Sequence, residues 1–180
     1  KENKKLGINS TKNFPVLSVL DPKLIVGSPM NVIASSGLDA VVHSVEAFVS
    51  KKATYVSRIF SREAFSLLYP ALKKIKNNPN DILSAGDLQL GAYLAIIGLA
   101  NSSAGPAGGL SYLLGTWNKV PHGIAGAFFL PEVQTLNIDK GCKTIADITK
   151  GKAAEEVVDM LFELNELFDV PKKLYHFGVS

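Results

Sequence analysis

The sequence predicts a mainly α fold, a helical bundle with one short β-strand near its N-terminus. Apolar residues recur at three- and four-residue intervals along most of the chain, which is the spacing of amphipathic helices. The chain has 180 residues, of which 47% are hydrophobic and 19% are charged. This balance excludes a disordered chain, and the length suffices for one well-packed core. We therefore expect a single globular unit.

The expected strand is FPVLSVLDP, residues 14–22, a short β-like run that Asp21-Pro22 closes. Every later segment has helical rather than alternating spacing. A lone strand of this kind has no neighbour in the sequence to satisfy its backbone edges. The strand is thus the element of the predicted fold that most needs a hydrogen-bonding partner from elsewhere.

The first predicted helix runs over 38–50, because Ser36 and Asp39 are spaced as in a capping box. The second covers 57–76, where apolar residues recur at helical intervals and lysines occupy the last turn. Pro70 lies inside this segment and predicts a kink or a break. Two helices are therefore expected in the first half of the bundle.

The turn NNPND at 77–81 precedes a third helix, for which Asp81 is the candidate cap. The segment 87–103 is apolar on almost every side, which predicts a helix at the centre of the bundle. Three further helices are expected over 110–117, from Pro121 onward, and over the amphipathic segment 152–168.

Charge and cysteine content exclude several classes of protein. The net charge of +3 comes from 19 basic and 16 acidic residues that are mostly interspersed, without the aromatic interleaving of a nucleic-acid surface. The single cysteine, Cys142, excludes an intramolecular disulfide and suits a reducing compartment. The segment 88–100 is shorter than a membrane span, and no signal peptide is evident. We expect a cytoplasmic protein with no nucleic-acid or membrane partner.

Asp39 and His43 are the first candidates for chemistry. They are four residues apart, so a helix presents the carboxylate and the imidazole on one face, as a divalent cation requires. His122 follows Pro121 at the start of a long apolar segment. The spacing also allows plainer roles, with Asp39 as a cap, His43 as a hydrogen-bonded helix residue and His122 as a polar residue in a first turn.

Three motifs together carry more information: GLDAVVHSVEAFVS at 37–50, GLANSSAGPAGGLSYLLG at 98–115 and VPHGIAGAFFLPEV at 120–133. In order and spacing they resemble the helical C-terminal domain of the iron-containing alcohol dehydrogenases, relatives of dehydroquinate synthase. The resemblance implies that residues 1–22 are the linker and last strand of a nucleotide-binding domain that is not part of this chain. Residues 23–180 would then be the helical metal and substrate domain, truncated at its C-terminus.

The resemblance also implies a site. In the family a divalent iron or zinc ion polarises the alcohol oxygen for hydride transfer to NAD(P). Asp39 and His43 fall on its first two metal ligands and His122 on its last. Gly108 stands where the family has a further histidine ligand, and Tyr112 stands where it has a histidine that handles a proton. Tyr112 is thus a candidate proton donor or, equally, an interior aromatic whose hydroxyl is satisfied.

Three hypotheses follow for function. The chain is the metal- and substrate-binding domain of an NAD(P)-dependent oxidoreductase acting on a small alcohol or aldehyde, inactive in isolation. Alternatively, Gly108 marks a degenerate, metal-free member of the family. In the third, the chain is a non-catalytic helical module that self-associates through uncovered apolar faces, and we expect a homodimer or larger form.

Two further residues have candidate roles. Glu46, three residues after His43, is either an exposed helix glutamate or a group that orients the His43 imidazole. His176 lies in the C-terminal stretch KKLYHFGVS with no partner in sequence, which predicts a surface position.

Overall fold

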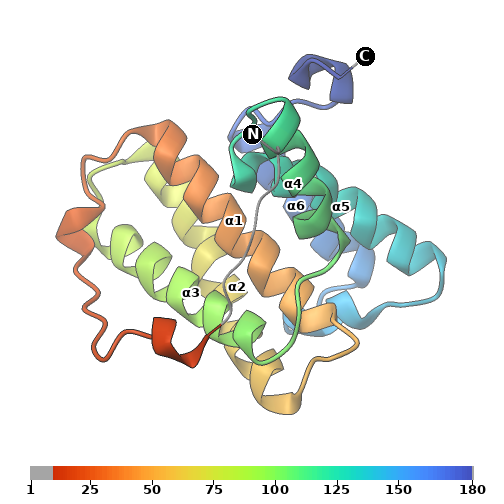
Figure 1. Ribbon diagram of the computed structural model, residues 1–180, viewed down its shortest axis with the longest axis horizontal. Helices are drawn as coiled ribbons and strands as arrows, with labels where there is room; N and C mark the ends of the chain where they lie inside the picture. The colour runs from red at the N-terminus through yellow and green to blue at the C-terminus, as the bar shows by residue number, and fades with distance from the viewer. Residues whose placement is uncertain (1–9, 180) are drawn as a thin grey trace.

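The computed structural model describes residues 10–179, and it forms a bundle of six α-helices (Figure 1). The helices are α1 Met30–Val49, α2 Tyr55–Asn77, α3 Ile82–Ala100, α4 Pro106–Trp117, α5 His122–Asp139 and α6 Ala154–Leu167. Short 3-10 turns lie at Thr11–Asn13, Pro22–Leu24, Thr144–Ile148 and Leu174–Phe177. The predicted mainly α bundle is confirmed.

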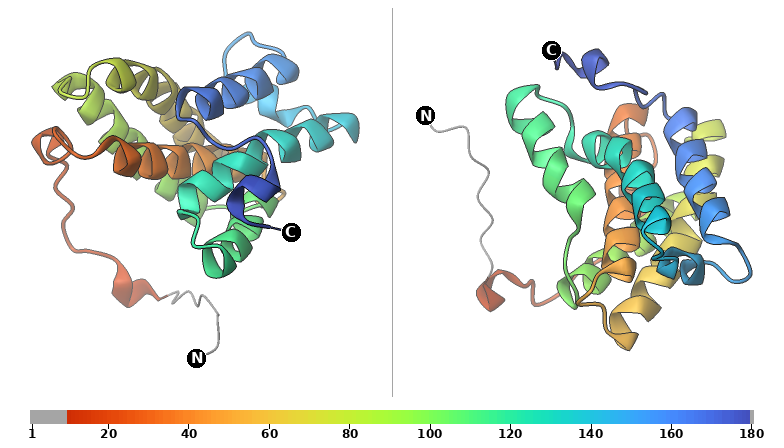
Figure 2. Two further views of the ribbon diagram at one scale, coloured as in Figure 1. Left: turned by 90° about the horizontal axis from the view of Figure 1, so that it is seen from above. Right: turned by 90° about the vertical axis from the view of Figure 1, so that its right-hand side faces the viewer.

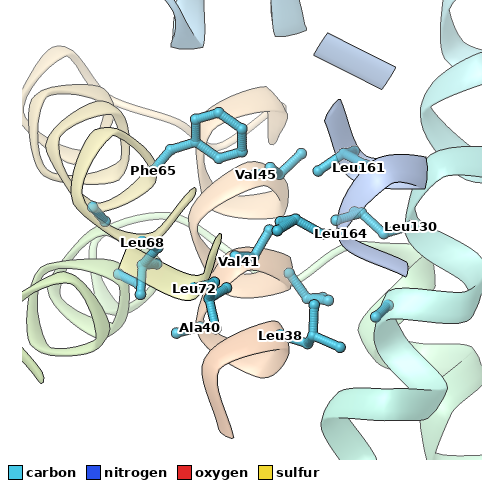
Figure 3. Packing of buried hydrophobic residues seen from close by; sticks show 14 of the residues in the cluster. Leu38, Ala40, Val41, Val45, Phe65, Leu68, Leu72, Leu130, Leu161 and Leu164 are labelled. Carbon is cyan, nitrogen blue, oxygen red and sulfur yellow. The ribbon is translucent and has the colours of Figure 1, made fainter. Parts of the chain in front are cut away.

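Helix α1 is the centre of the bundle. It packs against α2 and α3 on one side and against α5 on the other, and α6 packs on α5 (Figures 1 and 3). Twelve of its residues are buried, more than in any other helix of the described chain. Because helices pack on both sides of α1, the backbone that carries its polar side chains is held in a fixed position.

The core is a layer of aliphatic and aromatic side chains on both sides of α1. Figure 3 shows Leu38, Val41 and Val45 of α1 at its middle. Around them lie Phe65, Leu68 and Leu72 of α2, Leu130 of α5, and Leu161 and Leu164 of α6. Burial of such side chains contributes about 1.5–3 kcal/mol each, so this layer is the main stabilising contact between the helices.

The central position predicted for the third helix is wrong. Helix α3 buries only a narrow stripe of mostly small residues, while Leu83, Leu90, Tyr93 and Ile96 are exposed. Its small buried residues let it lie flat on α2 without inserting large side chains into the core. The helix that is apolar on almost every side is therefore partly exposed and does not lie at the centre of the bundle.

The predicted start of the first helix is also wrong. Helix α1 begins at Met30, after Pro29, and Ser36 lies inside it rather than capping it. The fixed φ of proline suits the position before a first turn, and the carbonyl of Pro29 accepts from Val32 and Ile33. By contrast, Asp81 caps α3 as predicted, since its carboxylate accepts from the Leu83 amide at 3.2 Å. Pro70 lies within α2 without ending it.

The predicted strand at 14–22 is not seen, and the described residues 10–179 contain no β-strand. The segment runs beside the bundle, and only the turn at Pro22–Leu24 packs on α3 (Figure 2). Its side chains Phe14, Val16, Leu17 and Val19 are exposed. A strand exists through its hydrogen bonds to a neighbouring strand, and this segment has no such neighbour among the described residues.

Two helices of the described chain, α1 and α3, are long and apolar enough to cross a membrane by length and composition. In α1 the apolar residues that satisfy this criterion are largely buried in the bundle. Core helices of globular proteins meet the same criterion. The expectation that the chain has no membrane partner stays a prediction.

Helix α5 depends on α6 for one of its own hydrogen bonds. Pro131 lies inside α5 and has no N–H, so the carbonyl of Ala127, four residues earlier, loses its helical partner. Asn165 of α6 replaces it, because its Nδ2 donates to the Ala127 oxygen at 2.7 Å. The two helices are thus joined by a partly buried polar contact as well as by packing.

We expect Asn165→Ala to lower the free energy of unfolding by about 1–2 kcal/mol, since it leaves the Ala127 carbonyl unsatisfied. Denaturant unfolding measures the loss. Asn77→Ala removes an exposed bond of the same kind, to the Lys73 carbonyl, and should cost less than about 0.5 kcal/mol. A Pro131→Ala background restores the missing N–H, so Asn165→Ala should cost less there. Equal costs in both backgrounds would contradict this role.

Candidate functional site

Asp39 and His43 face each other on the exposed side of α1. The Asp39 Oδ2 and His43 Nε2 atoms are 3.4 Å apart, one helical turn along α1. Both side chains are partly exposed, whereas their neighbours Leu38, Ala40 and Val42 are in the core. The remaining ring nitrogen of His43, Nδ1, is buried and has no hydrogen-bond partner. The predicted one-turn pairing of carboxylate and imidazole is therefore present.

His122 joins this pair from a distant part of the sequence. It is the first residue of α5, and its Nε2 lies 3.7 Å from Asp39 Oδ1. The ring centroids of His122 and His43 are 6.5 Å apart. Asp39 therefore lies between the two imidazoles, with one carboxylate oxygen toward each.

Gly123 makes this approach of α5 to α1 feasible. A Cβ atom at Gly123 would lie 1.8 Å from the carbonyl oxygen of Ser35 and 2.9 Å from the Cβ of Asp39. Only glycine avoids this collision with the α1 backbone. The motif Pro121-His122-Gly123 thus combines a helix start, a functional side chain and a close contact.

Helix α4 places two more side chains against His122. The Ser111 hydroxyl is buried and lies 2.8 Å from His122 Nδ1. The ring of Tyr112, which is about half exposed, lies 4.9 Å from the His122 ring between centroids. The structure thus brings Tyr112 to the site, where its role as a proton donor stays a prediction. Ser111 was missed in the sequence because a small polar residue inside a helix has no distinctive pattern.

Glu46 has a different role from both that the sequence suggested. Its side chain is 1% exposed, so it is not a surface glutamate. Its carboxylate accepts hydrogen bonds from the backbone N–H groups of Gly105, Ala107 and Gly108, at 2.9, 2.7 and 3.2 Å. These groups form the N-terminus of α4, which has no side-chain cap of its own. Glu46 therefore caps α4 from α1, where the helix dipole favours a negative charge.

Burial raises the pKa of the Glu46 carboxyl above its ordinary value. The three backbone N–H donors and the nearby His43 act in the opposite direction and partly offset the cost of burial. A buried carboxylate with several donors is costly to replace. Each N–H group left without an acceptor would remain buried away from water with no hydrogen bond in its place.

Gly108 contributes through its backbone rather than a side chain. Its N–H donates to Glu46 Oε2, and its carbonyl accepts from the Ser111 hydroxyl at 2.5 Å. A Cβ at this position would lie 2.9 Å from Glu46 Oε2. A side chain at residue 108 would thus begin in close contact with the Glu46 carboxylate.

The donor set suits a borderline divalent cation, because it consists of one carboxylate and two imidazoles. Ligands of one tetrahedral ion lie about 3.4 Å apart, and Asp39 lies at 3.4 and 3.7 Å from the two histidine nitrogens. Among the described residues, however, no group of three or more His, Cys, Asp or Glu side chains is arranged so that it could hold a metal ion. The match to such an ion therefore lies in the types of donor present and not in their present geometry.

His176 is exposed in the last 3-10 turn, as predicted.

We expect Glu46→Gln to lower the free energy of unfolding by about 2 kcal/mol, measured by denaturant titration. Glutamine keeps the size of the side chain, but it offers one acceptor oxygen instead of two and turns an NH2 group toward an N–H. Glu63→Gln, at an exposed glutamate of α2, is the matched control and should stay within about 0.5 kcal/mol. Similar losses in both variants would show that Glu46 does not hold α4.

Comparison with known proteins supports a family assignment. Residues 33–180 match the model of the Fe-containing alcohol dehydrogenase family, C-terminal part. The 1,3-propanediol dehydrogenase of Klebsiella pneumoniae is 28% identical over 187 residues, covering 98% of this chain and 48% of that protein. The NAD-dependent methanol dehydrogenase of Bacillus methanolicus is 27% identical, covering 98% of this chain and 49% of that protein.

A comparison with a solved structure leads to the same family. The crystal structure of a 1,3-propanediol oxidoreductase superposes with a TM-score of 0.82 and 26% identity, covering 89% of this chain and 45% of that one. The chain spans about half the length of the curated relatives it matches. It belongs to the iron-containing alcohol dehydrogenase family, and it corresponds to the C-terminal helical domain of these enzymes.

Proposed function

We propose that this chain is the metal- and substrate-binding half of an NAD(P)-dependent oxidoreductase that acts on a small alcohol or aldehyde. The observation that carries the proposal is the convergence of Asp39, His43 and His122 from α1 and α5. Nothing in the packing of a helical core requires a carboxylate between two imidazoles at a partly exposed position. A divalent cation, iron or zinc, gives this arrangement a reason.

When bound, such a cation supplies Lewis-acid polarisation of an alcohol or aldehyde oxygen. The residues of this chain would hold it and shape its surroundings. Asp39 supplies negative charge between the two imidazoles, and α1 fixes the spacing of Asp39 and His43. Tyr112 adjoins His122 and would place a phenol hydroxyl, which both donates and accepts hydrogen bonds, beside the reacting oxygen.

The nicotinamide cofactor belongs to the proposal only at the level of the family. One matched relative is described as NAD-dependent, and this chain covers 49% of it. No residue of this chain is assigned to the cofactor. The exposed apolar side chains on α3, including Leu90 and Ile96, are consistent with the homo-oligomer expected from the sequence, which stays a prediction.

We expect the chain to bind close to one Fe²⁺ or Zn²⁺, measured by elemental analysis after incubation and desalting. His122→Ala should lower the affinity at least tenfold, since two protein ligands remain of three. His176→Ala removes an exposed histidine outside the site and should leave binding unchanged. Absence of metal from the unmodified chain would favour the alternative of a degenerate, metal-free member with Gly108 at the lost ligand position.

The 180-residue chain alone should show no NAD(P)-linked oxidation of small alcohols above background. The reason is that it matches only the C-terminal part of its relatives, and no residue is assigned to hydride acceptance. Absorbance of the reduced nicotinamide at saturating metal measures the rate. Turnover that is abolished by His122→Ala would contradict this expectation.

A further inference from the structure

The Ser111 hydroxyl lies buried between α4 and the start of α5, and it has two partners. Its Oγ is 2.5 Å from the carbonyl oxygen of Gly108, one turn earlier in α4, and 2.8 Å from Nδ1 of His122. A serine hydroxyl carries one hydrogen and two lone pairs. A carbonyl oxygen can only accept, so the hydrogen of Ser111 is committed to Gly108.

The consequence is a fixed direction for the second hydrogen bond. Toward His122, the Ser111 oxygen can only accept, and Nδ1 of His122 must therefore carry a hydrogen. In the neutral imidazole the lone pair is then on Nε2. This is the reverse of the tautomer that neutral histidine favours in water.

The nitrogen selected in this way is the one that faces the candidate metal site. His122 Nε2 lies 3.7 Å from Asp39 Oδ1, which in turn belongs to the carboxylate shared with His43. A lone pair directed at a carboxylate is unfavourable unless positive charge lies near both. The tautomer therefore suits His122 to a cation held by Asp39.

We propose that Ser111 is a positioning residue that holds His122 in the Nδ1–H tautomer and so presents the Nε2 lone pair toward Asp39. Its value for metal binding rests on the function proposed above, but the tautomer itself does not. The hydrogen bonds that impose it form a chain from Glu46 through the backbone of Gly108 to Ser111 and His122.

His43 differs from His122 in the surroundings of its Nδ1 atom. Its Nδ1 is buried without a hydrogen-bond partner, so no hydroxyl on that nitrogen fixes its tautomer. Ser111 lies on α4, and the imidazole with which its hydroxyl forms a hydrogen bond is that of His122. A change at Ser111 should therefore alter one imidazole and leave the other as an internal reference.

The test is the ring nitrogen chemical shifts of the metal-free 180-residue chain, measured by long-range proton-nitrogen NMR about two pH units above 6.5, where imidazole is ordinarily neutral. The chain has three histidines, and His122→Ala assigns the signals. We expect protonated Nδ1 and unprotonated Nε2 for His122 in the unmodified chain. A protonated Nε2 there would overturn the inference without the need for any variant.

Two substitutions at Ser111 add a second measurement. Ser111→Ala should convert His122 to a mixture in which Nε2 carries hydrogen, and Ser111→Thr, which keeps the hydroxyl, should restore the original tautomer. Ser44→Ala is the control, because Ser44 is equally buried and donates to the carbonyl three residues earlier, at Val41. A His122 signal that is unchanged in Ser111→Ala, or shifted equally in Ser44→Ala, would overturn the role of Ser111.

Zinc titration of the same proteins separates this inference from the proposed function. Ser111→Ala should weaken zinc binding 10–100-fold and Ser111→Thr should recover it. If the tautomer is as expected but the unmodified chain binds no zinc, the proposed function fails and the role of Ser111 in fixing His122 stands. If zinc binds with equal affinity in all three proteins, the metal proposal stands and positioning by Ser111 is overturned.

Discussion

The carboxylate of Glu46 connects the centre of the bundle to the elements that complete the site. It projects from α1, the helix that carries Asp39 and His43, and it receives the backbone N–H groups that open α4. Helix α4 begins at Pro106, and its N-cap residue Gly105 has no side chain to cap it, so its first turn is satisfied from another helix. Glu46 therefore fixes the start of α4, the helix that carries Ser111 and Tyr112, to α1.

The site as a whole is built where helix ends meet the side of one central helix. His122 is the first residue of α5, and the residues that Glu46 holds are the first of α4. Helix N-termini carry partial positive charge and unsatisfied N–H groups, so they tolerate nearby carboxylates. Asp39 and Glu46, two turns apart on α1, supply those carboxylates. Electrostatics therefore favours a carboxylate at each of these two helix starts.

Local sequence patterns predicted those features that depend on spacing within one segment. The bundle, the Asp81 cap and the Asp39–His43 pair belong to this class, and the joining of His122 to that pair was implied by the family resemblance. The roles of Glu46 and Ser111 could not be predicted, because each depends on which backbone groups another helix brings within reach. The absent strand at 14–22 has the same origin, since strand formation is decided by a neighbour. The exposure of α3 shows that apolarity alone does not say what covers a helix.

The proline inside α5 has a consequence for how the site assembles. A helix that lacks one of its own hydrogen bonds is less stable in isolation, and α5 recovers that bond only from Asn165 of α6. The first half of the helix that starts with His122 is therefore completed by a segment more than thirty residues later in the sequence. Folding of α5 and docking of α6 become one cooperative event. The helix that carries His122 thus has its full set of hydrogen bonds here only once the chain has been made through Asn165 of α6.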